Sequence, residues 1–149
     1  MHVLREQDAV AVRDRLNEVA GPVRLVFFTE GSSGLIIPGR ECRYCRDAQR
    51  LLEDVASCSD QVTLEIHDRL NDPAAFTAYG ISRVPALVVA GAADYGVRYY
   101  GLPAGYELAT VLDLIVDASR GSAGLAAETT AALAALPADV HLQVFVTPT

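Results

Sequence analysis

The sequence predicts an α/β protein in which helices flank a mixed β-sheet. Along most of the chain, stretches with apolar residues at helical spacing alternate with short β-rich runs, which is typical of strands joined by helices. Two later β runs follow each other closely enough to form a hairpin, so we expect a sheet that is parallel at first and closed by antiparallel strands. The length of 149 residues suits one domain with a core of its own.

The first part of the chain predicts a helix, a strand and a second helix. Residues 9–19 carry apolar side chains at helical spacing, and Gly21-Pro22 ends this helix. The run Val23 to Thr29 predicts a strand buried on both faces. A loop over residues 30–41 leads to the next helix, whose apolar stripe runs from Cys45 to Val55. Because a loop of this length is long for a compact domain, we expect it to have a functional role.

The middle of the chain predicts a strand, a short helix and the hairpin. Val62 to His67 forms the strand. Asn71-Asp72-Pro73 predicts a helix start, because a capping residue precedes a proline at the first turn, and Gly80 predicts its end. The runs Ala86 to Ala90 and Gly96 to Tyr100 form the hairpin.

The last part of the chain predicts two helices and a strand. Leu108 to Ile115 marks the first helix, Leu125 to Leu136 the second, and Val140 to Val146 the strand. We expect residues 1–121 to form the main unit and residues 122–149 to be an additional helix and strand.

The charged residues exclude several classes of function. All twelve positive side chains are arginines, so the chain has no lysine for a phosphate-binding loop, a Schiff base or a general base. The net charge is −7 and the arginines are scattered singly, which argues against a nucleic-acid partner. The first residues do not form a signal peptide, and no apolar run approaches the ~18 residues of a membrane span. We therefore expect a soluble, cytoplasmic protein without a membrane partner.

The motif Cys42-Arg43-Tyr44-Cys45 lies where a loop after a strand enters a helix. Free backbone N–H groups and the positive end of the helix dipole lower the pKa of a thiol at that position. Arg40, Arg43 and Arg46 add to this effect. Because the thiolate is the attacking species in disulfide exchange, Cys42 is the candidate nucleophile and Cys45 the candidate resolving cysteine.

Two other interpretations of the cysteines remain. Cys42, Cys45 and Cys58, with His67, loosely resemble a zinc spacing, but a helix from residue 45 to residue 58 would separate its ends by ~20 Å. Inert buried cysteines are the second alternative, which fits Cys58 better than Cys42. We therefore expect neither a metal nor a cofactor, and we expect Cys58 to be structural.

A second motif supports redox chemistry. Val84-Pro85 comes directly before a strand, about forty residues after the cysteine pair. With these motifs the chain resembles the first half of the tandem thioredoxin-fold protein disulfide oxidoreductases, also called glutaredoxin-like, and more distantly the N-terminal domain of the alkyl hydroperoxide reductase flavoprotein. The residues that carry the resemblance are Cys42-Arg43-Tyr44-Cys45, residues 79–86 (YGISRVPA), residues 96–105 (GVRYYGLPAG) and residues 144–149 (VFVTPT).

The resemblance implies a thioredoxin-like three-layer fold with a mixed four-stranded sheet, and thiol–disulfide exchange through Cys42 and Cys45. It implies that Pro85 is a cis-proline facing the pair and that Val84 binds a substrate segment as an added strand. Arg43 and Tyr44 are the other candidate substrate-binding residues. Leu35 to Ile37 would either give the segment an apolar wall or pack onto the domain itself. The implied partners are protein disulfides and an external thiol or flavoprotein electron donor.

The chain also departs from this family. The loop before the motif is longer, and the tryptophan before the motif is missing. Residues 122–149 resemble the start of the family's second thioredoxin-like unit, but its C-x-x-C motif does not follow in this sequence. The strand Val23 to Thr29 lacks the buried acid that relays protons in thioredoxins, for which Glu65 or Glu30 could substitute.

The remaining predictions concern the histidines, two rival functions and the C-terminal strand. His2, His67 and His141 form no site pattern and are expected at the surface. One rival function is a glutathione-dependent glutaredoxin, with Arg43, Arg83 or Arg40 binding the carboxylates, and the other is a non-catalytic binding module. Because an open apolar edge is sticky, we expect the C-terminal strand to pair with the sheet edge or with a second copy in a homodimer.

Overall fold

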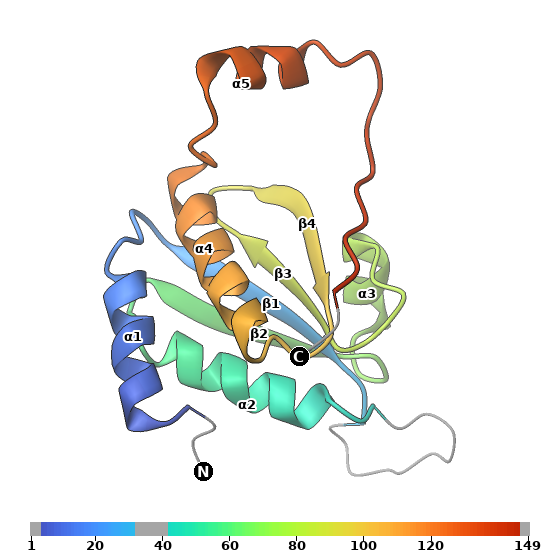
Figure 1. The fold of residues 1–149 in the computed structure, drawn as a ribbon. Helices are drawn as coiled ribbons and strands as arrows, with labels where there is room; N and C mark the ends of the chain where they lie inside the picture. Colours follow the sequence, from blue (N-terminus) through green and yellow to red (C-terminus); the bar gives the residue numbers. More distant parts are fainter. Residues whose placement is uncertain (1–3, 32–41, 147–149) are drawn as a thin grey trace.

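The computed structural model describes residues 4–31 and 42–146 (Figure 1). It confirms the α/β class: helices and strands alternate up to β3, β4 follows to complete a hairpin with β3, and two helices come last. The elements are α1 (Glu6–Leu16), β1 (Val23–Thr29), α2 (Cys45–Ala56), β2 (Val62–Asp68), α3 (Pro73–Tyr79), β3 (Ala86–Ala90), β4 (Asp94–Tyr100), α4 (Tyr106–Arg120) and α5 (Ala127–Ala134).

The four strands form one mixed sheet in the order β2-β1-β3-β4. β1 and β2 are parallel, whereas β3 is antiparallel to both β1 and β4. The β3–β4 hairpin is the one that the sequence predicts, although β4 begins at Asp94, two residues before the predicted start. The predicted mixed, four-stranded sheet is therefore confirmed.

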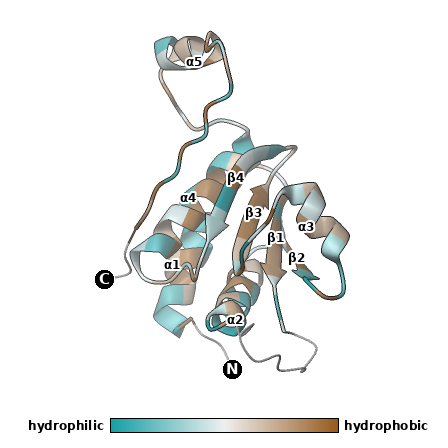
Figure 2. Ribbon diagram, turned by 90° about the vertical axis from the view of Figure 1, so that its right-hand side faces the viewer, coloured by the Kyte–Doolittle hydropathy of each residue, from teal (hydrophilic) through white to brown (hydrophobic). Residues whose placement is uncertain are grey.

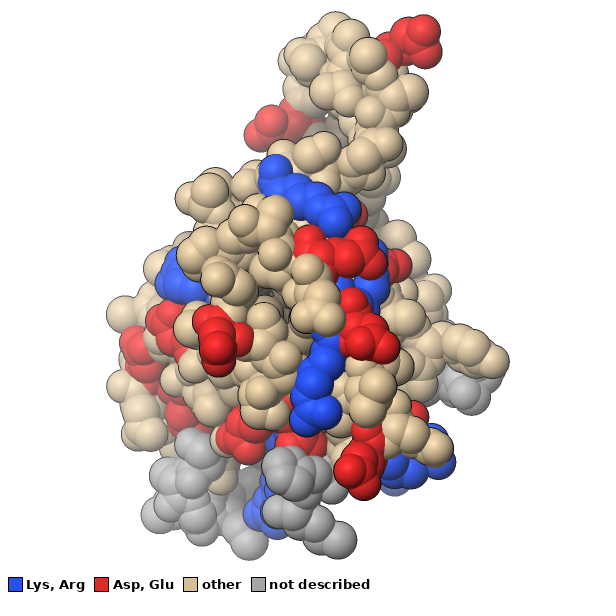
Figure 3. Space-filling model, turned by 90° about the vertical axis from the view of Figure 1, so that its left-hand side faces the viewer, with Lys and Arg blue, Asp and Glu red and all other residues tan. Residues whose placement is uncertain are grey.

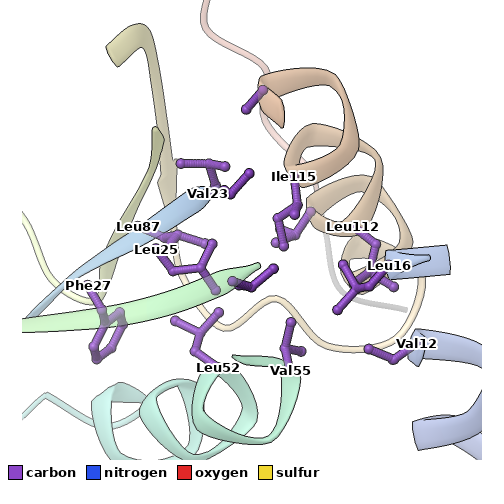
Figure 4. Close-up of a cluster of buried hydrophobic side chains, with 14 of the residues drawn as sticks. Val12, Leu16, Val23, Leu25, Phe27, Leu52, Val55, Leu87, Leu112 and Ile115 are labelled. Atoms are coloured by element: carbon purple, nitrogen blue, oxygen red, sulfur yellow. The ribbon is translucent and has the colours of Figure 1, made fainter. Parts of the chain in front are cut away.

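Helices cover both faces of the sheet, so the fold has three layers. On one face, α1, α2 and α4 pack on odd-numbered residues of β1, and Figure 4 shows Leu25, Leu52 and Ile115 in this core. On the other face, α3 packs on Val26 and Phe28 (Figure 2). Because successive residues of a strand point to opposite faces, β1 is buried on both faces, as its sequence predicts.

The ends of α3 form as the sequence predicts. The Asp72 side chain accepts a hydrogen bond from the Ala75 N–H at 3.3 Å, and Pro73 occupies the first turn. Gly80 ends the helix with a φ of 66°, a left-handed conformation that glycine adopts without steric cost. These short-range signals fix where the chain turns back toward β3.

The predicted strand Val140 to Val146 does not form. Residues 121–146 are all exposed, and α5 stands away from the sheet and its covering helices (Figures 1 and 2). A strand needs a partner for its backbone hydrogen bonds, and no described strand of this chain pairs with these residues. The expected pairing with this chain's own sheet edge is therefore wrong. Among the described helices, none is long and apolar enough to cross a bilayer.

Candidate active site

One edge of the sheet gathers the motifs that the sequence singles out. Phe28, near the carboxyl end of β1, pairs with Ala86 at the start of β3, and Ala86 pairs with Tyr100 at the end of β4. Since β2 is parallel to β1, it also ends at this edge, which we call the active edge. The cysteine motif, Val84-Pro85 and the loop after Tyr100 all adjoin it (Figure 1).

The two motif cysteines form a disulfide, with 5.4 Å between their Cα atoms. Cys45 is the first residue of α2 and is buried, whereas Cys42 is half-buried. The first α-helical hydrogen bond runs from the Ala48 N–H to the Tyr44 carbonyl at 2.9 Å, so the N–H groups of the preceding helical residues have no partner within the helix. These N–H groups and the helix dipole favour negative charge on a sulfur atom at this end.

The Val84–Pro85 peptide bond is cis, as the resemblance implies. Pro85 is buried, and its carbonyl accepts a hydrogen bond from the Gly101 N–H at 3.0 Å. Gly101 has a φ of 113°, which favours glycine at this point. The loop of residues 101–105 thereby holds the segment before β3. The sequence signals this loop only as part of the GVRYYGLPAG motif.

Three exposed tyrosines border the active edge, and two of them contact an arginine side chain. The Arg43 guanidinium carbon lies 5.3 Å from the ring centre of Tyr44, and the Arg83 guanidinium carbon lies 5.0 Å from that of Tyr100. Tyr106 begins α4 and is 86% exposed. Of the predicted site residues, Arg43 and Tyr44 are exposed and Val84 is partly buried. Tyr100 and Tyr106 are absent from the predicted site, because spacing does not reveal which tyrosines stay in solvent.

The two acids predicted to replace the missing relay acid are engaged elsewhere. Glu65 contacts the Arg24 guanidinium at 3.0 Å and the His67 ring at 2.8 Å, on the α3 face of the sheet. Glu30 lies 3.3 Å from the Arg69 guanidinium. The buried carboxylate at the active edge is Asp68, which pairs in register with buried Thr29. Because Asp68 alternates in phase with Val62 and Leu64, it belongs to the α2 face.

The histidines and Cys58 are placed as follows. His67 is not a simple surface residue: it stacks on Phe28, and its ring nitrogens contact Glu65 and Asp72. His141 is exposed as predicted, and His2 lies outside the described residues. Cys58 is a free thiol that follows the far end of α2 and donates a hydrogen bond to the Asp54 carbonyl at 3.3 Å.

Two further points concern a metal site and the loop before the cysteine motif. In the part of the chain that the structure describes, no three His, Cys, Asp or Glu side chains are grouped to hold a metal ion. Arg40 and the Leu35 to Ile37 cluster lie outside the described residues.

Comparison with known proteins agrees with this geometry. The family model described as a thioredoxin domain matches residues 35–113. A protein disulfide oxidoreductase from Aeropyrum pernix K1 superposes with a TM-score of 0.75 at 28% identity, over 91% of this chain and 57% of that one. No curated protein matches.

A second similar structure is that of an alkylhydroperoxide reductase, AhpF, from Enterococcus faecalis (V583). Its TM-score is 0.74 at 23% identity, over 90% of this chain and 61% of that one. The chain therefore spans about three fifths of the length of each of these two structures.

Proposed function

This chain belongs to the thioredoxin domain family, and we propose that it is a thiol–disulfide oxidoreductase that acts on protein disulfides. The observation that supports the proposal most directly is the Cys42–Cys45 disulfide at the start of α2. The half-buried Cys42 is the nucleophile, because it is the more accessible of the two sulfur-bearing residues. The buried Cys45 is the resolving cysteine.

The reaction moves two electrons from the protein to the substrate. In the dithiol form, the Cys42 thiolate attacks one sulfur of a substrate disulfide; a Cys42–substrate bond forms, and the first substrate thiolate leaves and is protonated. Cys45 then loses its proton and attacks the Cys42 sulfur. This step forms the Cys42–Cys45 disulfide and releases the second substrate thiolate, which is also protonated. An external thiol or flavoprotein restores the dithiol with two electrons and two protons.

The neighbouring residues bind and orient the substrate segment. Val84 offers backbone groups beside the start of β3, where an extended segment adds as a strand. Pro85, held by the Gly101 N–H, fixes the position of these groups. Arg43 and Tyr44 lie between the two cysteines in sequence and contact the segment on the other side.

The test is the reduction of insulin by dithiothreitol, followed as turbidity. We expect the chain to accelerate the reaction and Cys42→Ser to lower the added rate at least about 100-fold, because the variant lacks the nucleophile. Cys58→Ser is the matched control and should keep the full rate, since Cys58 follows the far end of α2. No rate above the dithiothreitol background, or an unchanged rate with Cys42→Ser, contradicts the proposal.

Trapping of the mixed-disulfide intermediate tests the role of Cys45 as the resolving cysteine. Cys45→Ser should accumulate a mixed disulfide between Cys42 and the substrate, since no thiol remains to resolve it. Mass spectrometry of the unreduced mixture measures this adduct. If no adduct forms with Cys45→Ser while the wild type is active, Cys45 is not the resolving residue.

A glutathione-dependent activity is the second candidate function. Arg43 and Arg83 are exposed and form no ion pair with a described residue, so both guanidinium groups are available to the carboxylates of glutathione. A glutathione-coupled assay distinguishes this activity from the exchange with protein disulfides that uses both cysteines. Turnover that depends on glutathione and continues with Cys45→Ser supports the glutathione-dependent activity. If the cysteines alkylate with a pKa near the unperturbed ~8.5 and show neither activity, a non-catalytic binding module is the better interpretation.

A further inference from the structure

The arginines of this chain fall into two groups. Among the described residues, most arginines form ion pairs with acidic side chains, as Arg15 does with Glu18 and Asp113. Figure 3 shows this mixing, with basic and acidic side chains lying side by side on the face that includes α1. The arginines with an acidic partner are Arg5, Arg15, Arg24, Arg69, Arg98 and Arg120.

Most of the arginines without an acidic partner lie in segments that adjoin the active edge. Within the described part of the chain, the arginines without such a partner are Arg43, Arg46, Arg50, Arg83 and Arg13. The first four belong to the cysteine motif, to α2 or to the segment before Pro85, and only Arg13 lies elsewhere, on α1. All five are exposed. In a chain with a net charge of −7, exposed arginines without a described acidic partner are therefore concentrated in and next to the segments that carry the disulfide and the cis-proline.

Acidic groups offset part of the positive charge of these arginines. Asp47, in the first turn of α2, is exposed and compensates one arginine. Glu30 is paired with Arg69. Two more carboxylates lie near this end of the sheet: the buried Asp68, and Glu107, which accepts a hydrogen bond from the Tyr99 hydroxyl at 2.7 Å. The amino-terminal end of the α2 dipole adds further positive potential.

Two of these guanidinium groups are already oriented. The guanidinium carbons of Arg43 and Arg83 each lie over a tyrosine ring, 5.3 and 5.0 Å from its centre, which is a cation–π contact. The N–H groups lie in the plane of the guanidinium and remain available for a carboxylate, which they bind in a two-pronged fashion. Exposed tyrosines and arginines are also the residues that carry most of the energy at protein interfaces.

We infer that the active edge selects disulfides that lie in acidic, extended protein segments. This inference rests on the proposed function and names its substrate class. Arg83, two residues before the cis-proline, binds one carboxylate of the segment, and Arg43, within the cysteine motif, binds another. Because these contacts are exposed, they act mainly on the rate of association and weaken with salt.

The test uses peptides that contain the same disulfide and differ in the residues beside it, which are glutamates, glutamines or arginines. Pre-reduced protein, freed of other thiols, is mixed with each peptide, and the second-order rate constant is measured. Each value is divided by the rate constant for the neutral thiol 2-mercaptoethanol with the same peptide. This division removes the intrinsic effect of the flanking charges on the disulfide.

At low salt we expect the glutamate peptide to react about five-fold faster than the glutamine peptide, the size that one or two exposed ion pairs give. The arginine peptide should be the slowest. In about 0.5 M salt, where charges are screened within a few ångströms, the ratio should fall toward one. Arg83→Gln should lose at least half of the preference for glutamate over glutamine.

Arg13→Gln is the matched control, since it removes the same charge from an exposed arginine on α1 that has no acidic partner among the described residues. It should keep the preference. Equal normalised rates for the three peptides, or an equal loss in Arg13→Gln and Arg83→Gln, overturn the inference while the proposed function stands. If pre-reduced protein reacts with no peptide at all, the proposed function fails and the inference fails with it.

Discussion

At the scale of single residues, Arg98 ties β4 to the end of α3. Its guanidinium contacts both carboxylate oxygens of Asp94, at 2.8 and 2.7 Å, and it donates a hydrogen bond from Nε to the Tyr79 carbonyl at 3.0 Å. Asp94 also accepts a hydrogen bond from the Gly96 N–H. The Arg98 contacts hold the pKa of Asp94 below its usual value of 3.8.

This lowered pKa predicts a pH-dependent contribution to stability. Because the folded state binds the proton less tightly than the unfolded state, the contribution is complete above about pH 4 and is lost as the pH falls through the folded-state pKa. We expect Asp94→Asn to lower the free energy of unfolding at pH 7 by about 0.5–1 kcal/mol, allowing for solvent screening of a partly exposed pair. Urea unfolding of the wild type and of Asp94→Asn, at pH 7 and below pH 3, measures this difference in the free energy of unfolding.

The difference between wild type and Asp94→Asn should be smaller at the lower pH, because protonation of Asp94 weakens its contacts with Arg98. Asp8→Asn is the control, since Asp8 contacts Arg5 in an exposed pair and has no second partner among the described residues. A difference that stays constant with pH would show that the pair does not stabilise the fold through its charge.

At the scale of elements, the turn between β3 and β4 packs directly on α4. A Cβ atom added at Gly91 would lie 2.0 Å from the Ala118 carbonyl oxygen and 2.8 Å from its carbon. Since both are backbone atoms of a packed helix, neither can move away without displacing α4. The glycine is therefore required by the distance between the hairpin and the helix.

Gly91→Ala should lower the free energy of unfolding by about 2–3 kcal/mol, the cost of overpacking a rigid site. Gly21→Ala is the matched control, because its Cβ would meet the Ser119 carbonyl oxygen at an ordinary 3.6 Å. That variant should be neutral or slightly stabilising. Urea unfolding measures both changes, and equal effects in the two variants would contradict the close contact at Gly91.

At the scale of the whole molecule, residues 122–146 form an arm that contributes no buried residue to the described core. All of its residues are exposed, and its last seven are largely apolar, with Val144 and Phe145 more than 80% exposed. An apolar extended segment with unpaired backbone groups favours association with another strand. We propose that the arm pairs with a second copy of this chain.

Light scattering after gel filtration tests the proposed pairing of the arm with a second copy of the chain. The full chain should be a dimer, whereas truncation after Gly121 or the pair Leu142→Asp and Val144→Asp should give a monomer. The truncated chain should keep its unfolding midpoint in dilute solution, since no residue of the arm belongs to the core. A monomeric full chain contradicts the proposed pairing.

Much of the fold could be predicted because its signals are local. The buried stripe of α2, the cap of α3 at Asp72 and its end at Gly80 each depend on residues within one or two turns. Val140 to Val146 has an equally clear strand pattern, yet no strand forms, because a strand also needs a partner that its own sequence cannot supply.

The candidate site also has parts that local sequence predicts and parts that depend on contacts between distant segments. The cysteine motif and Val84-Pro85 are recognisable from short stretches of sequence, and the register of β1, β3 and β4 brings them to one edge. The buried position of Asp68 and the holding of Pro85 by Gly101 could not be predicted, because both depend on contacts between segments far apart in the chain.

Short stretches of sequence are enough to give the order of the elements, most of their ends and the position of the redox motif, since periodicity, capping and motif spacing are properties of neighbouring residues. Which arginines have acidic partners depends instead on the packed fold. All twelve are equivalent in the sequence, but ion pairs such as Arg15 with Asp113 and Arg24 with Glu65 form across long separations. Among the described residues, packing leaves Arg43, Arg46 and Arg83 without an acidic partner next to the disulfide or the cis-proline, and the binding of carboxylates proposed for the site rests on that.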